Sequence, residues 1–271
     1  MKKEKRVEKT PFQKLISALD SFFNDDTTYY AASLSFFTIF SILPIIALAI
    51  SIVSSLPQFD NYIEIFMQYI LELLNPTHSK QFITQIENFI SNSNHLGSIG
   101  IIYMLFVFTM FFKDFEYIVN KIHKAKRKSI YASFFFYLSF ILVFPILFVA
   151  YLVMIALFDN AFFNFLLSFC FAWIIFFGLF KLTVNRYIDN KAALISSFLT
   201  LVTLSVTKNL FVYYVVYNKT YTTIYGSLAT LLFFFFWIYI SWIIYLYGVK
   251  LCHQLNIKAL SHRFKTNTHV D

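Results

Sequence analysis

A long apolar run occupies the middle of the chain, from Ile130 to Leu182: IYASFFFYLSFILVFPILFVAYLVMIALFDNAFFNFLLSFCFAWIIFFGLFKL. As one helix, its 53 residues would extend about 80 Å at about 1.5 Å per residue. The hydrocarbon core of a bilayer is only about 30 Å thick. Asp159–Asn160 is the one polar break in the run. The run therefore predicts two membrane-spanning helices joined by a turn at that break.

The same composition recurs along the chain and predicts six transmembrane helices, because a helix needs about 20 apolar residues to cross the hydrocarbon. The predicted spans are 31–53, 96–119, 130–158, 161–182, 192–217 and 224–249. Pro44 and Pro145 fall inside two of them and are expected to kink their helices. Charged residues make up only 13% of the chain, against about 25% in a soluble domain. The predicted fold class is all-α: a polytopic integral membrane protein with a single membrane domain, residues 1–271.

The lysines and arginines outside the spans alternate between crowded and sparse segments. The N-terminal segment holds six, the second connection six when Lys113 at the inner end of the second span is included, the fourth connection three when Lys181 at the end of the fourth span is included, and the C-terminal end four. The first and fifth connections hold one each, and the third holds none. By the positive-inside rule, both the N-terminal segment 1–28 and the tail 252–271 are expected in the cytoplasm.

The net charge of +8 does not indicate nucleic acid, because the basic residues sit next to span ends, where anionic lipid satisfies them. Membrane lipids are the predicted partners. The six histidines and two cysteines show no ligand spacing, so neither a metal nor a cofactor is expected. No Walker A, GxSxG or HExxH motif is present, and no catalytic residue is predicted.

The connection 54–95 is the only long external segment, and its sequence is helical. Polar residues recur every four positions with apolar residues between them, at Asp60, Glu64, Gln68 and Glu72. We expect an external amphipathic helical loop. It either packs over the outer end of the bundle, or forms a lid or a docking surface for an envelope protein.

Lys208 is the one cation that lies well away from the ends of a predicted span, where a charged group is costly. It stands beside Asn209 on a segment that also carries Thr203 and Thr207. Two interpretations remain open. These residues line an internal cavity that binds an anionic ligand, or Lys208 extends to the interface while the hydroxyls bond neighbouring helices. No acidic residue is expected in the apolar core of a span, so an internal Lys208 would meet an anionic ligand or an acid from outside.

A second polar group gathers at the inner end of the second span. Its members are Lys113, Asp114, Glu116 and Asn120, with Arg186 following the fourth span on the same side. The group is either a network of ion pairs that fixes helix ends, or an inner gate or lipid-headgroup site.

Motifs near both ends of the chain carry a family resemblance. Asp26 precedes AASLSFFTIFSILP at Ala31–Pro44, and the C-terminal third contains IYGSLA at Ile224–Ala229, WIYIS at Trp237–Ser241 and LYGVKL at Leu246–Leu251. These motifs resemble the YihY/BrkB family of bacterial inner-membrane proteins. The sequence departs from the family where Gly248–Val249–Lys250 replaces the usual Gly-Ala-Glu.

The resemblance covers nearly the whole chain and implies six helices around a central cavity in the bacterial inner membrane, with no settled activity. Members have been labelled as tRNA-processing ribonucleases, an activity for which this sequence offers no metal-binding His/Asp set. Others have been linked to serum resistance and to envelope lipid transport.

These features together predict a multi-pass inner-membrane protein that moves a lipid or an amphiphilic anion across or within the membrane, without ATP. The alternative is a structural or assembly factor that docks envelope proteins through its external helices. A ribonuclease is the disfavoured third interpretation. Oligomeric state is not encoded in any of these features.

Overall fold

The structure is a computed structural model that describes residues 26–54, 83–84, 88, 97–157, 160–217 and 228–267. The predicted external loop lies almost wholly outside these residues, as does the N-terminal segment up to residue 25.

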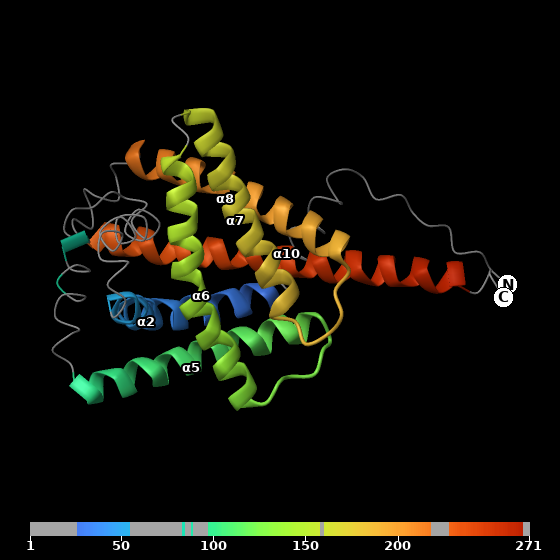
Figure 1. Cartoon of the computed structure of the whole chain (residues 1–271), viewed down its shortest axis with the longest axis horizontal. Coiled ribbons are helices and arrows are strands. Elements are labelled where there is room, and N and C mark those ends of the chain that lie inside the picture. The colour runs from blue at the N-terminus through green and yellow to red at the C-terminus, as the bar shows by residue number, and fades with distance from the viewer. Residues whose placement is uncertain are drawn as a thin grey trace, which may run out of the picture.

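Six long helices account for nearly all of the described residues, which contain no strand, and the predicted all-α class is confirmed (Figure 1). They are α2 (Asp26–Ser54), α5 (Gly97–Ile122), α6 (Ile130–Ala156), α7 (Ala161–Leu182), α8 (Asn190–Tyr217) and α10 (Leu228–Asn267). Pro44 lies inside α2 and Pro145 inside α6. The kinks expected there stay a prediction.

Helices α6 and α7 form the hairpin that the central apolar run predicts (Figure 1). The side chain of Asn160 caps α7 by accepting hydrogen bonds from the backbone N–H groups of Phe162 at 2.9 Å and Phe163 at 3.4 Å. An asparagine at this position satisfies amides that have no partner within the helix. The polar break in the sequence thus ends one apolar helix and begins the next.

Four of the helices are long and apolar enough to cross a membrane: residues Ile130–Ile155, Ala161–Leu182, Asn190–Tyr217 and Leu231–Ser261. Helices α2 and α5 add 29 and 26 residues, and the count of six spans stays a prediction. Helix α10 has 40 residues, about 60 Å at about 1.5 Å per residue. It extends beyond the other helices at its C-terminal end (Figure 1).

Helix α10 is the central element of the bundle and packs on α2, α5 and α8. The indole N–H of Trp242 donates to the Thr38 hydroxyl of α2 at 2.8 Å. On its other side, Gly248 faces Thr200 of α8 so closely that no Cβ would fit between them. Small and hydroxylated residues commonly allow helices to approach closely in membranes. Part of the predicted hydroxyl-rich helix therefore serves packing.

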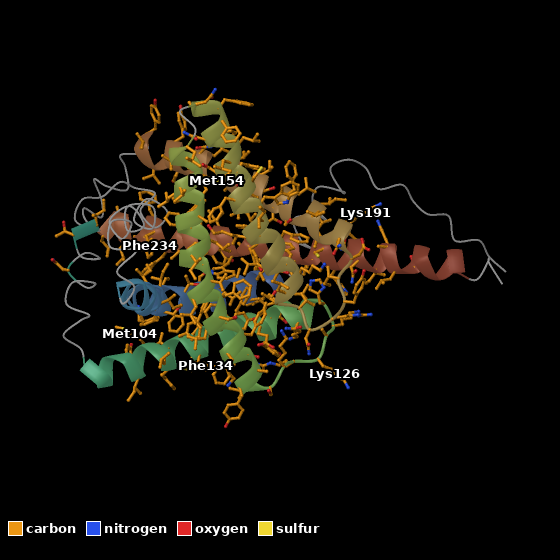
Figure 2. All side chains as sticks on the ribbon, viewed as in Figure 1. Met104, Lys126, Phe134, Met154, Lys191 and Phe234 are labelled. Atoms are coloured by element: carbon orange, nitrogen blue, oxygen red, sulfur yellow. The ribbon has the colours of Figure 1, made fainter. Side chains whose placement is uncertain are left out.

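The surface of the bundle separates into an apolar girdle and a basic end. Nitrogen-bearing side chains gather where Lys126 and Lys191 lie, whereas carbon dominates around Met154 and Phe234 (Figure 2). Large apolar side chains are exposed on α6 and α7, such as Phe135, 66% exposed, and Phe162, 75% exposed. Exposed apolar surface on this scale fits a lipid environment.

Candidate functional site: a basic-mouthed pocket between α5 and α6

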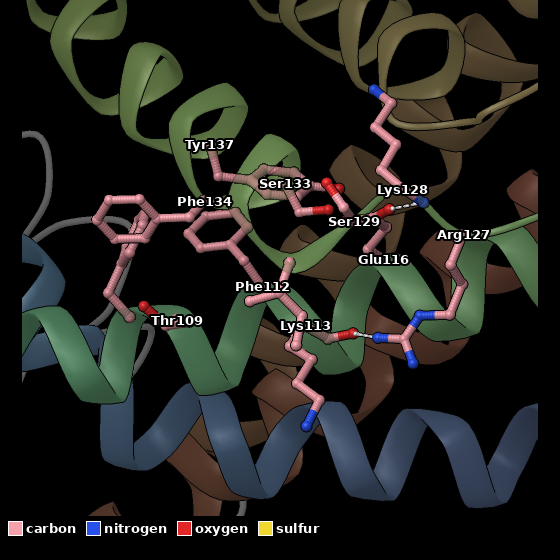
Figure 3. Close-up of a pocket in the computed structure, with 12 residues that line it drawn as sticks. Thr109, Phe112, Lys113, Glu116, Arg127, Lys128, Ser129, Ser133, Phe134 and Tyr137 are labelled. Carbon is pink, nitrogen blue, oxygen red and sulfur yellow. Dashed lines mark hydrogen bonds between the residues drawn. The ribbon is translucent and has the colours of Figure 1, made fainter.

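A pocket of about 250 Å³ lies between α5 and the start of α6 (Figure 3). Its residues recur every four positions on both helices, so each helix turns one face to the pocket. The α5 face carries Phe108, Phe112 and Glu116, and the α6 face carries Ser129, Ser133 and Tyr137. Each face is polar near the connection between the two helices and aromatic farther along.

The aromatic wall is built from contacts between the two helices. Phe112 and Tyr137 stack with their ring centroids 4.4 Å apart. Phe108 meets Phe134 edge to face at 6.1 Å. Such pairs stabilise by about 0.5–1.5 kcal/mol beyond their buried area, and here they hold α6 against α5.

The inner end of the pocket is polar and buried. Glu116 is only 2% exposed, and its carboxylate accepts a hydrogen bond from the backbone N–H of Lys128 at 3.1 Å. Tyr137 is also 2% exposed, and within the described residues its hydroxyl has no partner. The Glu116, Ser133 and Tyr137 side chains converge on the same space (Figure 3). The pocket thus encloses acceptors whose bonding capacity is only partly used.

The mouth of the pocket is basic. Lys113, Arg127 and Lys128 line it beside the N-terminus of α6, which Ser129 caps. The Arg127 guanidinium donates to the backbone carbonyl of Lys113 at 3.1 Å and lies 5.2 Å from the Tyr117 ring centroid. The Lys113 ammonium points toward α2 (Figure 3), so it is Arg127, the nearby Lys128 and the helix N-terminus that favour an anion at this position.

In the structure, the polar residues predicted to cluster at the inner end of the second span contact different parts of the bundle. Lys113 and Glu116 line the pocket. Asp114 turns to α2, where the Ser33 hydroxyl donates to it at 2.8 Å. Asn120 is buried elsewhere, and Arg186 is exposed on the connection between α7 and α8. The sequence therefore identified two residues of the pocket, but not the face of α6 that completes it.

Glu116 is more deeply enclosed than its place at the inner end of the second predicted span indicates. Its carboxylate lies near the C-terminal end of α5 and is enclosed by the start of α6. The sequence could not show this, because the covering residues come from another helix. Their spacing, serine–serine–tyrosine every four positions, was the available signal.

Two buried amides fasten the connection between α7 and α8 to the rest of the bundle. The Asn120 side chain donates to the Thr183 carbonyl at 3.2 Å and accepts from the Asn185 N–H at 2.7 Å. In the same way, Asn256 of α10 accepts from the Asp189 N–H at 2.8 Å and donates to the Tyr187 carbonyl at 3.1 Å. Asn120 thus has a structural role: it holds the α7–α8 connection against α5.

The group around Lys208 lies away from this pocket, on α8. Lys208 and Thr207 are half-buried, and Thr203 and Asn209 are exposed. The Thr203 hydroxyl donates to the Leu199 carbonyl of its own helix at 2.8 Å. None of the four lines the pocket between α5 and α6. A cavity at Lys208 stays a prediction.

His123 follows directly after α5 and is almost completely buried, with 1% exposed. Its ring lies edge to face with that of His253, 5.2 Å away. Burial, with the His253 ring and the Arg186 charge, lowers the pKa of His123 to about 3. The folded protein therefore holds this imidazole neutral.

We expect acid to destabilise the protein through His123. Below about pH 6.5 the His123 imidazole binds a proton in the unfolded state but stays neutral in the folded state. The free energy of unfolding therefore falls as the pH falls from 6.5 towards 3. Between pH 7 and pH 5 the loss is about 2 kcal/mol. Melting of detergent-solubilised protein at the two pH values measures it. His123→Gln should flatten the pH dependence, and an unchanged dependence in this variant would contradict the prediction.

The histidines, cysteines and acids of the described residues are dispersed over the bundle. Among the described residues, no group of three or more His, Cys, Asp and Glu side chains could hold a metal ion. Cys170 is half-buried and Cys252 buried, and both are free.

Long apolar helices, a hydrocarbon-like exterior and a basic end define a polytopic α-helical membrane protein. Residues 18–267 match the family described as virulence factor BrkB, so the chain belongs to that family. It is 26% identical to a UPF0761 membrane protein of Pseudoalteromonas atlantica, over 91% of this chain and 87% of the relative. It is 27% identical to one of Haemophilus influenzae, over 83% and 88%. No solved structure matches the chain.

Proposed function

We propose that the protein binds a membrane lipid or amphiphilic anion in the pocket between α5 and α6, and moves it across or within the bacterial inner membrane. One observation carries the proposal: the pocket joins a mouth of three basic residues to an aromatic wall. An amphiphile has the same division between an anionic end and an apolar body.

The surroundings of the pocket support a lipid. Ile130 and Tyr131 at the start of α6 are 58% and 79% exposed, and Phe106 of α5 is 60% exposed. Acyl chains can lie along these side chains while the headgroup enters the pocket. The volume of about 250 Å³ is below the usual range of pockets that enclose a whole drug-sized ligand, about 300–1,000 Å³. It corresponds to about eight waters at about 30 Å³ each, which suits a headgroup alone.

Transport of a fluorescent phospholipid tests the proposal. Purified protein is reconstituted into vesicles that carry a trace of acyl-labelled lipid, and an impermeant quencher reports its movement between leaflets. Wild-type protein should accelerate the movement well above that of protein-free vesicles. Arg127→Gln/Lys128→Gln should slow it several-fold, because the mouth loses two cations.

Lys126→Gln is the matched control, because Lys126 is a lysine of the same connection and does not line the pocket. Wild-type protein that moves no lipid would end the proposal and favour an envelope assembly factor that docks partners. Full activity of the double variant would show that transport does not use this pocket.

Lys208 is a further cation that we assign to the route, apart from those at the mouth of the pocket. Its charge stands inside a candidate membrane span, Asn190–Tyr217, where a cation is costly and is retained mainly for function. Lys208→Met should keep expression and folding but lower lipid movement, whereas Lys208→Arg should keep part of it because either cation can meet a phosphate. Full activity of Lys208→Met would remove Lys208 from the route.

A further inference from the structure

We propose that this pocket selects a primary ammonium joined to a phosphate, the phosphoethanolamine headgroup, with the ammonium on Glu116 and the phosphate at the basic mouth. The inference rests on the proposed function, because it names the substrate class of the same pocket.

The Glu116 carboxylate is buried and, within the described part of the chain, forms no ion pair with the cations of the mouth. Its hydrogen bond comes from a backbone N–H, that of Lys128. The Lys128 ammonium lies instead over the Phe136 ring, 4.0 Å from its centroid, and the Arg127 guanidinium is bound to the Lys113 carbonyl. A buried carboxylate is stable only when it is paired or neutralised. An entering ammonium would provide the missing charge.

The number of acceptors fits a primary ammonium, which has three N–H donors. Glu116, Ser133 and Tyr137, each with a side-chain oxygen, line the inner end of the pocket (Figure 3), and the Tyr137 hydroxyl oxygen is itself buried. Tyr137 is the independent sign of a ligand, because its buried hydroxyl has no partner among the described residues. A quaternary ammonium has no N–H group and would leave these acceptors unsatisfied.

The aromatic wall and the mouth complete the match. The rings of Phe112 and Tyr137 border the same space and attract a cation through their ring electrons. Arg127 and the N-terminus of α6 then lie at the mouth, where the phosphate of the same headgroup would emerge. A purely anionic headgroup would satisfy the mouth but would face the Glu116 charge inside.

Native mass spectrometry of the full chain in detergent tests the selection. Four lipids with identical acyl chains are compared: phosphatidylethanolamine, phosphatidylglycerol, phosphatidylcholine and N-acetylated phosphatidylethanolamine. We expect phosphatidylethanolamine to bind at least about tenfold more tightly than the other three, a difference of about 1.4 kcal/mol. N-acetylation is the sharpest comparison, because it removes the ammonium charge and leaves the phosphate in place. Soluble phosphoethanolamine, added as competitor, separates recognition of the free compound from recognition of the lipid.

Glu116→Gln should abolish the preference, since it keeps an acceptor for the Lys128 N–H but loses the charge. Asp114→Asn is the matched control, because this acid lies two residues away and turns to Ser33 of α2. It should keep the preference. Should Glu116→Gln fail to fold, Tyr137→Phe is the second variant and should reduce the preference several-fold.

Two results would overturn the headgroup selection and leave lipid binding standing: equal binding of all four lipids, or a preference that survives Glu116→Gln. A wild-type protein that retains no phospholipid more strongly than Arg127→Gln/Lys128→Gln would refute both the selection and the proposed function.

Discussion

We expect Gly248→Ala to lower the free energy of unfolding by about 2–3 kcal/mol. Gly248→Leu should yield no monodisperse protein. A Cβ at this position would overlap the Thr200 hydroxyl and lie 3.0 Å from the Phe180 ring. Thr200 cannot easily turn away, because it is buried and donates to the Ser196 carbonyl at 2.7 Å. Helices α8 and α10 would have to separate.

Gly178→Ala provides the matched control on α7. A Cβ there would meet its nearest neighbour, the Leu182 side chain, only at 4.0 Å. Alanine is favoured over glycine in a helix by about 1 kcal/mol, so this variant should melt slightly higher than wild type. Thr200→Ala should recover part of the loss when combined with Gly248→Ala. Melting curves of these variants in one detergent test the prediction. An unchanged melting temperature for Gly248→Ala would show that α8 and α10 are not in close contact.

The second large effect is expected at Asn120. Asn120→Leu removes both the donor to the Thr183 carbonyl and the acceptor for the Asn185 N–H. Each buried group left without a partner costs about 1–3 kcal/mol, so the loss of both partners is expected to cost about 2–6 kcal/mol. Thermal unfolding followed by the accessibility of buried Cys252 to a thiol-reactive dye measures it.

Asn209→Leu is the control for Asn120→Leu, because it makes the same substitution at an exposed position of α8. It should change stability by less than about 0.5 kcal/mol. Similar unfolding of both variants would mean that Asn120 does not fasten the α7–α8 connection.

The sequence was sufficient for the helices, because the physics that defines them is local. A long apolar run and the polar residue that interrupts it can be recognised in the sequence without knowing which helices are neighbours. Helix α7, for example, has the predicted bounds, Ala161–Leu182. The C-terminal end of the last helix was harder to predict. Nothing in its sequence stops a helix after the membrane, and α10 continues to Asn267 through most of the predicted tail.

The pocket was only half predictable, because it depends on which helices meet. The polar group on α5 was visible, and it included Lys113 and Glu116. Ser133 and Tyr137 were not, because α6 is apolar on nearly all sides and its inner face is decided by contact with α5. In the sequence only the polarity of Asn120 is visible, whereas its partners lie more than 60 residues later in the chain.

The contact between Gly248 and Thr200 also limits how this molecule can change shape. Because Gly248 of α10 lies directly against the Thr200 side chain of α8, we expect these two helices to move together as one frame, to which Trp242 and Thr38 join α2. Helix α6 is held more lightly: its second half contacts α7 through Tyr151 and Phe171, and its first half covers the pocket. An arm that swings at α6 would widen the pocket and leave the frame untouched. Such a motion of α6 would act on the site where we place the ligand.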